Sequence, residues 1–267
     1  MPMKRLISIN AVVVALLAMP AMAADMPVKA PDYSAPSAFF NWTGAYAGIS
    51  LGGRWTDTAW TTTGIGSPLG SPDPTANPSS FDSSTFRAGG YIGYNWQIAP
   101  LWVIGVEADV AWGHNNNTLA GIPGTYGTCG LCVSPGATAV DSSNVKLGWD
   151  GSSRGRVGFL ITPMWLLYAT GGVAWQQADI NATCDGSFAS WCIAARNETF
   201  STTKVGWTVG GGAEMLLWSN WLLRAEYRYA DYGNISHTFF AGSNADEVEM
   251  HKSLKTNTVL MGLAYKF

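Results

Sequence analysis

The sequence has 267 residues, with 15 Lys and Arg against 18 Asp and Glu and a formal net charge of −3. This slightly acidic balance excludes a nucleic-acid-binding protein, which needs a basic surface to meet phosphates. Only 12% of the residues are charged, where about 25% is usual for a soluble domain. The composition therefore indicates that something other than water faces much of the surface.

The first 23 residues have the pattern of an export signal. Lys4 and Arg5 precede a short apolar run, and Ala21-Met22-Ala23 supplies small residues for cleavage. Because the apolar run is too short to cross a bilayer as a helix, we expect residues 1–23 to be removed. Residues 24–40 are rich in Pro and Ala and are expected to form an extended tail.

Eight segments with a period of two follow along the chain, and this period predicts β-strands. They lie at about 42–55, 85–97, 101–113, 145–162, 164–178, 203–217, 220–235 and 255–267. Hairpin-sized turns join the second segment to the third, the fourth to the fifth and the sixth to the seventh. The other connections are long polar stretches, at 56–84, 114–144, 179–202 and 236–254.

Tight turns at one end and long loops at the other are typical of a bacterial outer-membrane barrel, in which the short turns face the periplasm. Loops of this size count against a compact soluble domain, such as a lipocalin-like carrier. We therefore predict an all-β fold, an eight-stranded antiparallel up-and-down transmembrane β-barrel over residues 41–267. The extended tail at 24–40 would then lie in the periplasm.

Each predicted strand has one apolar face and one face that collects charges and glycines. An Arg in the middle of a membrane costs about 2–4 kcal/mol. Four arginines facing lipid would therefore cost on the order of 8–16 kcal/mol, as much as the whole stability of a domain. The charged face must point into the barrel. Its residues are Arg54, Arg87, Glu107, Asp109, Arg154, Arg156, Glu214, Arg224, Glu226, Arg228 and Lys266.

The interior of an eight-stranded barrel is only just wide enough to be filled by side chains. We interpret the inward charges as a plug of paired Arg and Glu side chains. A narrow channel that prefers anions is the alternative, because the predicted set holds seven bases and four acids.

The tryptophans support the membrane interpretation. Eleven of the 13 lie in two bands, one near the tight turns and one near the long loops, as expected of aromatic girdles at two membrane interfaces. Trp42 belongs to the band at the tight turns, whereas Trp60 and Trp191 fall in predicted loops.

Several stretches resemble one known family. These are NWTGAYAGISLGG (41–53), GYNWQ (93–97), WVIGVEADVAWG (102–113), LLYATGGVAW (166–175), GWTVGGGAEMLL (206–217), LRAEYRYADYG (223–233) and VLMGLAYKF (259–267). They are similar to the porin-like outer-membrane β-barrel family of alphaproteobacteria, which is related to opacity proteins and to the barrel of OmpA.

The resemblance implies an envelope protein of the bacterial outer membrane that stabilises this membrane, with weak pore activity sometimes attributed to the family. It also implies that Tyr265 and Phe267 form the signal read by the barrel-assembly machinery. Partners would be outer-membrane lipids and lipopolysaccharide, and we expect a monomer. A small-solute porin and an adhesin-like surface protein are the alternatives.

The four cysteines, Cys129, Cys132, Cys184 and Cys192, are expected to be oxidised in an exported chain. Local pairs, 129 with 132 and 184 with 192, are the simplest of three connectivities. Pairing between loops and a zinc site formed by all four remain alternatives. A thioredoxin-like redox role is disfavoured because the Cys129–Cys132 motif has no βαβ context.

Catalytic and metal-binding signals are weak. His114, His237 and His251 are scattered in or beside loops, and no spacing indicates a Ser/His/acid site. We therefore predict neither enzyme activity nor a cofactor. Acidic residues of the last loop, with His251, either bind a divalent cation, contact lipopolysaccharide through bridging ions, or are simply solvated. They are Asp246, Glu247 and Glu249.

Overall fold

The computed structural model describes residues 40–66, 79–125, 141–187, 190–243 and 245–267. Within these ranges it contains eight long strands and the two-residue strand β2 (Ser79–Ser80), which pairs with β1. The long strands are β1 (Gly44–Ile65), β3 (Ser83–Ala99), β4 (Trp102–Ala120), β5 (Ser142–Thr162), β6 (Trp165–Cys184), β7 (Arg196–Trp218), β8 (Trp221–Phe239) and β9 (Val248–Lys266).

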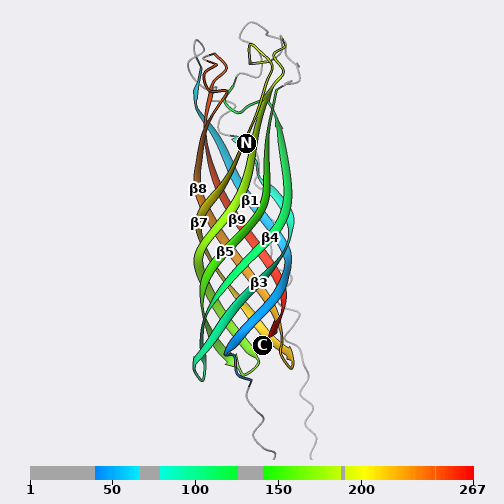
Figure 1. Cartoon of the computed structure of the whole chain (residues 1–267), viewed down its shortest axis with the longest axis vertical. Helices are drawn as coiled ribbons and strands as arrows, with labels where there is room; N and C mark the ends of the chain where they lie inside the picture. The colour runs from blue at the N-terminus through cyan, green and yellow to red at the C-terminus, as the bar shows by residue number, and fades with distance from the viewer. Residues whose placement is uncertain (1–39, 67–78, 126–140, 188–189, 244) are drawn as a thin grey trace, which may run out of the picture. The chain divides into compact units, whose positions relative to one another are not determined.

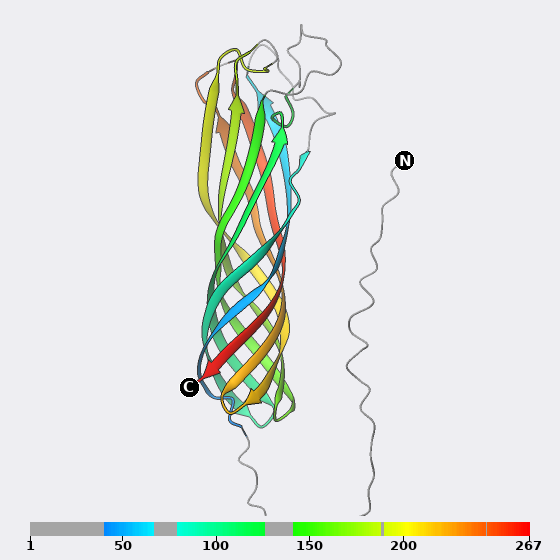
Figure 2. The ribbon, with the colours of Figure 1, turned by 90° about the vertical axis from the view of Figure 1, so that its right-hand side faces the viewer.

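Each long strand is antiparallel to the next, and β1 also pairs with β9, so the sheet closes into a barrel. Figures 1 and 2 show the tilted strands winding around this barrel. The predicted fold class is confirmed. None of the described residues forms a helix long and apolar enough to cross a membrane.

Three tight turns lie together at one end of the barrel, which we call the turn end (Figure 1). They consist of Pro100-Leu101, Pro163-Met164 and Ser219-Asn220. The seam between β1 and β9 also reaches this end, where the amide of Phe267 donates a hydrogen bond of 2.9 Å to the carbonyl of Ala45. We call the opposite end of the barrel the loop end.

At the loop end the strands continue into segments that the sequence analysis predicted to be loops. β1 runs on to Ile65 and β6 to Cys184, while β7 already begins at Arg196 and β9 at Val248. The strand ends were predicted from the apolar face that lipid requires. Each predicted strand therefore ended where its outward residues become polar. The chain nevertheless remains extended there, because its alternate residues are apolar and pack inward.

In β4, β5 and β8, β-bulges exchange the inward and outward faces beyond the ionic layer. In β1, β6 and β9 the same parity faces inward along the whole strand, and the inward residues themselves become apolar toward the loop end. Register shifts occur between Leu147 and Asp150 in β5, and others lie in β4 and β8. In β5 the buried residues have even numbers through Arg154 and Asp150, and then odd numbers at Leu147 and Val145. A bulge inserts one unpaired residue, so the face of every later side chain is exchanged. The barrel is therefore apolar outside near the turn end and apolar inside near the loop end.

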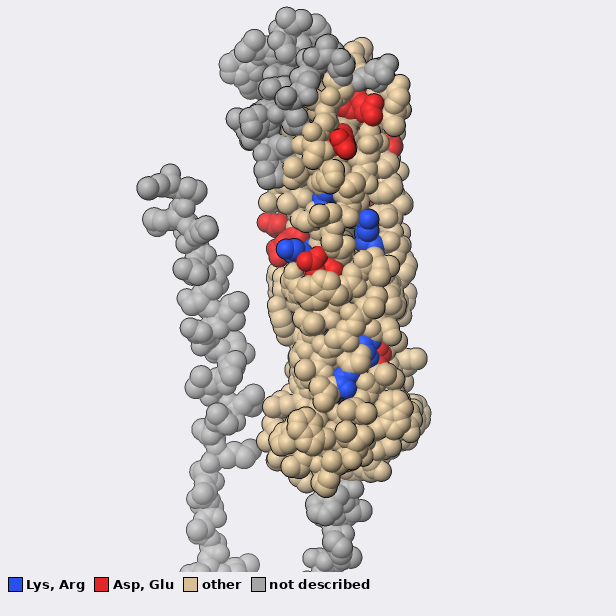
Figure 3. All heavy atoms as spheres, turned by 90° about the vertical axis from the view of Figure 1, so that its left-hand side faces the viewer, with Lys and Arg blue, Asp and Glu red and all other residues tan. Residues whose placement is uncertain are grey.

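The outer wall between the turn end and the bulges exposes large apolar side chains. Exposed fractions reach 66% at Phe86, 64% at Ile92 and 65% at Val205. On the face that Figure 3 shows, most charged side chains lie toward the loop end, and the surface near the turn end is mainly uncharged. A surface of this kind is stable only against hydrocarbon.

Two carboxylates anchor the connection between β6 and β7. Asp141 accepts hydrogen bonds from the Ser190 hydroxyl (2.6 Å) and the Trp191 amide (2.8 Å). Asp246 accepts from the Ile193 amide (2.8 Å) and from Nε of Arg196 (2.7 Å). The β4–β5, β6–β7 and β8–β9 connections are thus linked to one another by hydrogen bonds at the loop end.

Candidate functional site in the barrel lumen

The lumen between the turn end and the bulges contains a network of buried ion pairs. Its lower part, nearer the turn end, is built around Glu107, whose carboxylate contacts Arg154 and Arg224 at 2.5 Å each. Glu226 pairs with Arg154 at 2.7 Å. Glu214 pairs with Arg156 at 2.9 Å and also with Arg224.

The upper part of the network lies next to the bulges. Asp150 binds Arg54 at 2.8 Å and Arg87 at 2.7 Å. Asp109 binds Arg87 at 2.6 Å and Arg228 at 3.1 Å. Arg228 also reaches Glu226 at 2.9 Å, so the two parts form one continuous network.

Three tyrosines from different strands pack among these charges. The hydroxyls of Tyr46 and Tyr168 donate hydrogen bonds of 2.8 Å to Glu107 and Glu226, respectively. Guanidinium groups lie over the tyrosine rings, with Arg156 4.1 Å from the centroid of Tyr168 and Arg224 4.2 Å from that of Tyr91. These cation–π contacts fill the space between the ion pairs with aromatic carbon.

Glycines on the facing strands provide the room for these rings. A Cβ atom at Gly93 would lie 2.3 Å from the Tyr46 hydroxyl oxygen, and one at Gly212 would lie 2.7 Å from that of Tyr168. The inward glycines therefore accommodate tyrosines as well as long charged side chains.

An apolar layer closes the network on the side of the turn end. Trp42 is completely buried there and donates from Nε1 to the Pro163 carbonyl at 3.2 Å. Leu160, Leu166 and Leu222 belong to the same buried cluster. Trp42 was predicted to belong to a membrane girdle. That prediction was wrong, because this fully buried indole packs in the apolar cluster of the turn end and donates its hydrogen bond to Pro163 there.

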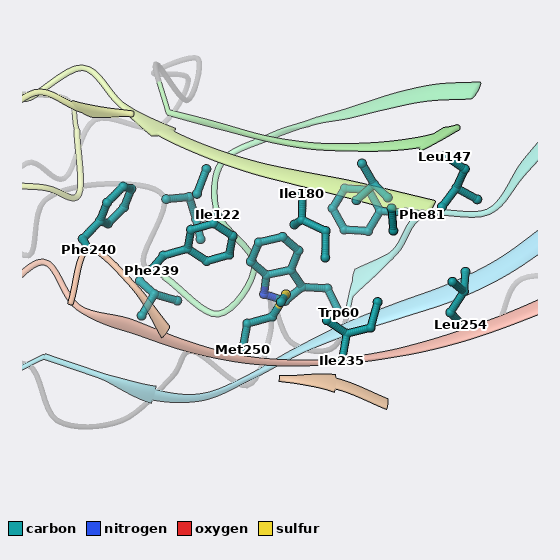
Figure 4. Close-up of a cluster of buried hydrophobic side chains, with 14 of the residues drawn as sticks. Trp60, Phe81, Ile122, Leu147, Ile180, Ile235, Phe239, Phe240, Met250 and Leu254 are labelled. Atoms are coloured by element: carbon teal, nitrogen blue, oxygen red, sulfur yellow. The ribbon is translucent and has the colours of Figure 1, made fainter. Parts of the chain in front are cut away.

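A larger apolar core fills the lumen on the side of the loop end (Figure 4). The Trp60 ring is fully buried and stacks on Phe239, with ring centroids 5.7 Å apart. Ile180, Met250 and Leu254 are buried in the same cluster. Trp60 was predicted to lie in a loop, but the extension of β1 carries it into this core. The described lumen is thus filled in three layers, apolar, ionic and apolar.

The structure brings ten of the eleven predicted lumen charges into the ionic layer. The exception is Lys266, which forms no ion pair with a described residue and lies 5.2 Å from the Phe40 ring centroid. The ten are Arg54, Arg87, Glu107, Asp109, Arg154, Arg156, Glu214, Arg224, Glu226 and Arg228.

Asp150, which pairs with two arginines, was not among the predicted lumen charges. The sequence indicates that Asp150 faces the lumen, because it has the same parity as Arg154 and Arg156 in one predicted strand. The lumen tyrosines were not predicted either, although Tyr46 shares the parity of Arg54. The tyrosines were missed because only charged residues were assigned to the lumen.

The other predicted site residues lie outside the ionic layer. Cys184 and Cys192 form a disulfide, as predicted, whereas Cys129 and Cys132 lie outside the described residues. A zinc site formed by all four cysteines is excluded, because two of the sulfurs are bonded to each other. Tyr265 and Phe267 lie on the outer wall with ring centroids 5.3 Å apart.

The acidic residues of the last connection do not form a cation site. Asp246 is committed to Arg196 and to a backbone amide. No group of three or more His, Cys, Asp or Glu side chains that could hold a metal ion occurs in the part of the chain that the structure describes.

Comparisons with known proteins agree with this architecture. The family model "Outer membrane protein beta-barrel domain" matches residues 11–267. The "31 kDa outer-membrane immunogenic protein" of Brucella melitensis is 32% identical over 271 residues, which cover 97% of this chain and 98% of that protein. The "22 kDa outer membrane protein" of Rhizobium leguminosarum is 31% identical over 188 residues, 70% of this chain and 69% of that protein.

Among solved structures, the outer membrane protein OprG from Pseudomonas aeruginosa has a TM-score of 0.51 and 13% sequence identity. The match covers 85% of this chain and 97% of OprG. At this identity the likeness shows the fold alone. Together with the family match and the two alphaproteobacterial relatives, it confirms the predicted resemblance and localisation: the chain belongs to the outer-membrane β-barrel protein family.

Proposed function

We propose that the protein is a structural outer-membrane barrel whose lumen is closed to solutes. The observation that carries this proposal is the three-layered filling of the lumen. Trp42 is fully buried below the ionic layer and Trp60 is fully buried above it. Between them the Arg154 and Glu226 side chains are both 0% exposed. A solute would have to displace apolar side chains at both ends and break buried ion pairs between them.

The charge balance of the ionic layer supports a plug more than an anion channel. The predicted set had seven bases and four acids, but Asp150 joins it and Lys266 does not. The layer therefore holds six arginines and five carboxylates, and each of them has an oppositely charged partner within 4 Å. Little uncompensated positive charge is left to attract an anion.

Single-channel recording in planar lipid bilayers tests the proposal. The purified barrel, with folding checked by heat-modifiable migration on gels, should give no stable openings in molar salt. A general porin measured in the same membranes serves as the positive control. Reproducible openings of uniform size that scale with salt concentration would refute a closed lumen.

We further propose that Tyr265 and Phe267 are read by the barrel-assembly machinery, as the family resemblance implies. Both rings lie on the outer wall of the last strand, and Phe267 is 70% exposed, so its removal leaves the lumen untouched. Replacing Phe267 by Ala should lower the amount of folded barrel in the outer membrane of cells, while the purified variant refolds in detergent as the wild type does. Equal failure in both settings would indicate a folding defect instead.

The contacts of the described histidines support a non-catalytic role. Nε2 of His237 binds Glu198 at 2.8 Å, and Phe200 stacks on the imidazole with a centroid distance of 4.0 Å. No hydroxyl or thiol of a described residue is hydrogen-bonded to this imidazole, so no nucleophile is activated by it. Nδ1 of His251 lies 3.2 Å from the exposed Thr63 hydroxyl, but no described carboxylate pairs with the His251 ring to orient it as a base. We expect no reaction of the folded protein with a fluorophosphonate probe for serine hydrolases.

A further inference from the structure

Lys252 of β9 lies among the apolar side chains of the loop-end core, outside the membrane. The residue is 2% exposed, and its Nζ, shielded from solvent, donates no hydrogen bond to any described residue. Its register partners are Trp60 on β1 and Ile235 on β8, neither of which offers an acceptor. A buried ammonium group without an acceptor is unfavourable, and neither the ionic layer nor the membrane requires a cation at this place.

Two aromatic rings are the described groups that stabilise the Lys252 charge. Nζ lies 4.8 Å from the ring centroid of Phe81 and 5.9 Å from that of Trp60. Such cation–π contacts compensate only part of the lost hydration. Burial therefore lowers the pKa of Lys252 from 10.5 to about 7, and the charge of this core changes near neutral pH.

Phe81 belongs to a short segment, Ser79–Asp82, which we call the strap. Its strand β2 has two residues, whereas each of the other described strands has at least 17. β2 pairs with β1, the Phe81 amide donates to the Thr58 carbonyl at 2.8 Å, and Asn117 donates to the Asp82 carbonyl at 3.1 Å. Because fewer ladder bonds hold a two-residue strand than a long one, the strap can open locally while the barrel stays folded.

The strap covers the part of the core that contains Lys252. Phe81 is 3% exposed, and its ring centroid lies 6.0 Å from that of Trp60. In Figure 4 the Trp60 indole lies between the rings of Phe239 and Phe81. Lifting the strap removes Phe81 from this stack, and it gives water access to the Lys252 ammonium.

Other titratable groups face this part of the lumen from the neighbouring elements. At this height β1, β5 and β6 direct only uncharged side chains inward. Imidazole ordinarily changes its charge near neutral pH, so His237, which binds Glu198 at 2.8 Å, needs a control variant. The groups are Asp82 in the strap, Tyr232 and His237 on β8, and Glu198 and Lys204 on β7.

We propose that the strap is an acid-sensitive lid, which lifts from Trp60 when Lys252 takes up a proton. With a neutral amine the strap lies closed over an apolar core. With an ammonium group the open form gains stability, because only the open form lets water solvate the charge. Acid therefore uncovers apolar side chains at the loop end, and this effect does not depend on whether the lumen below conducts.

Hydrogen exchange of the folded barrel in an uncharged detergent tests this proposal. The reporter is the Phe81 amide, because its hydrogen bond to Thr58 breaks when the strap lifts. Opening takes up close to one proton between about pH 7 and pH 10.5. The protection factor of this amide, corrected for the intrinsic exchange rate, should therefore fall about fiftyfold from pH 9 to pH 7. In Lys252→Met it should change less than about threefold.

Two control variants separate Lys252 from other titrating groups. Lys255→Met removes an exposed lysine of the same strand, and His237→Gln removes the imidazole. Both should keep the fall in protection. An equal protection factor at pH 9 and pH 7 in the wild type, or an equal fall in Lys252→Met, would overturn the proposal. Loss of the fall in His237→Gln would also overturn it, because the imidazole would then be the responding group.

A second measurement leaves Lys252 in place, and it therefore holds even if Lys252→Met fails to fold. A nitroxide label at the exposed position of Ser80 should gain a mobile fraction as the pH falls from 9 to 6. A label at the exposed Ser201 of β7, far from the strap in sequence, should keep its spectrum. Unchanged motion at position 80, or an equal change at position 201, would contradict a lid confined to the strap.

Discussion

Glu107 pairs with three arginines, Arg154, Arg156 and Arg224, in the lower part of the network. Its carboxylate contacts Arg154 and Arg224 at 2.5 Å each and receives the Tyr46 hydroxyl at 2.8 Å. Removing one member of a buried ion network leaves the others uncompensated, which costs about 3–5 kcal/mol. Glu107→Gln should therefore lower the free energy of unfolding by this amount, measured by urea titration in lipid vesicles.

The matched control for this prediction is Asp57→Asn, because Asp57 is an exposed acid on the outer wall. Its effect should lie within about 0.5 kcal/mol of the wild type. A loss for Glu107→Gln no larger than that for Asp57→Asn would show that the lumen charges are solvated, and it would remove the main support for a plug.

Lys252 is a buried cation without an ionic partner among the described residues. It lies in the apolar core of the loop end, outside the membrane, with Nζ 4.8 Å from the ring centroid of Phe81 and 5.9 Å from that of Trp60. Its Nζ donates no hydrogen bond to any described residue. Burial among these rings lowers the pKa of the Lys252 ammonium from 10.5 to about 7.

This lowered pKa predicts a dependence of stability on pH. Between about pH 7 and pH 10.5 the unfolded chain binds the Lys252 proton more tightly than the folded chain does, so stability rises with pH. Below about pH 7 both states are protonated, and the full penalty of the buried charge, on the order of 5 kcal/mol, is present. Lys252→Met should therefore stabilise the barrel at pH 6 and should flatten the rise in the urea midpoint from about pH 7 to pH 9.

Lys255→Met is the control for this measurement, because Lys255 is an exposed residue of the same strand. Other groups also titrate in this range, but their contribution is common to all three proteins. If the curves of Lys252→Met and the wild type were parallel, the ammonium would have to be solvated in the folded barrel.

At the scale of the strand, two adjacent glycines of β6 face opposite sides of the barrel wall. Gly172 faces the lumen and Gly171 faces lipid. A Cβ atom at Gly172 would lie 2.2 Å from the carbonyl oxygen of Ser153, a backbone atom that cannot move alone. The nearest atom to a Cβ at Gly171 would lie 3.8 Å away, an ordinary contact distance. Gly172→Ala should thus destabilise the barrel by about 1–3 kcal/mol.

Gly171→Ala should leave the stability unchanged or raise it slightly, because alanine reduces the freedom of the unfolded chain. The two variants differ by one position in the same strand. Comparing their urea midpoints therefore shows how an added methyl group affects stability on the lumen side and on the lipid side. Equal midpoints would contradict the close approach of β5 and β6 at this level.

The strands also show what the sequence could and could not predict. The number of strands, the tight turns and the charged inner face follow from a period of two and from the high cost of charge in lipid. The extensions beyond the girdle were missed because their polarity is reversed, as the buried Leu147 of β5 shows. Trp42 was misplaced because its position along the chain gives its height in the barrel but not whether its ring points inward or outward.

The whole molecule combines two barrels of opposite polarity in one continuous sheet. Near the turn end, ionic residues are inside and apolar residues face lipid, whereas near the loop end an apolar core is surrounded by a polar wall. The loop end is therefore organised like a water-soluble barrel. Together the strands extend the sheet beyond the membrane interface.

This arrangement predicts two environments on one face of one strand. Val209 and Ser201 both point outward from β7 and are separated by eight residues, about 27 Å along an extended strand. A nitroxide spin label at position 209 should be relaxed by oxygen, which concentrates in hydrocarbon. A label at position 201 should be relaxed by a water-soluble nickel chelate. Both labels should have the restricted motion of an ordered strand, because the sheet continues without interruption between them. Fast, loop-like motion at 201, or relaxation by oxygen there, would mean that the strands end at the membrane surface and that no extension stands above it.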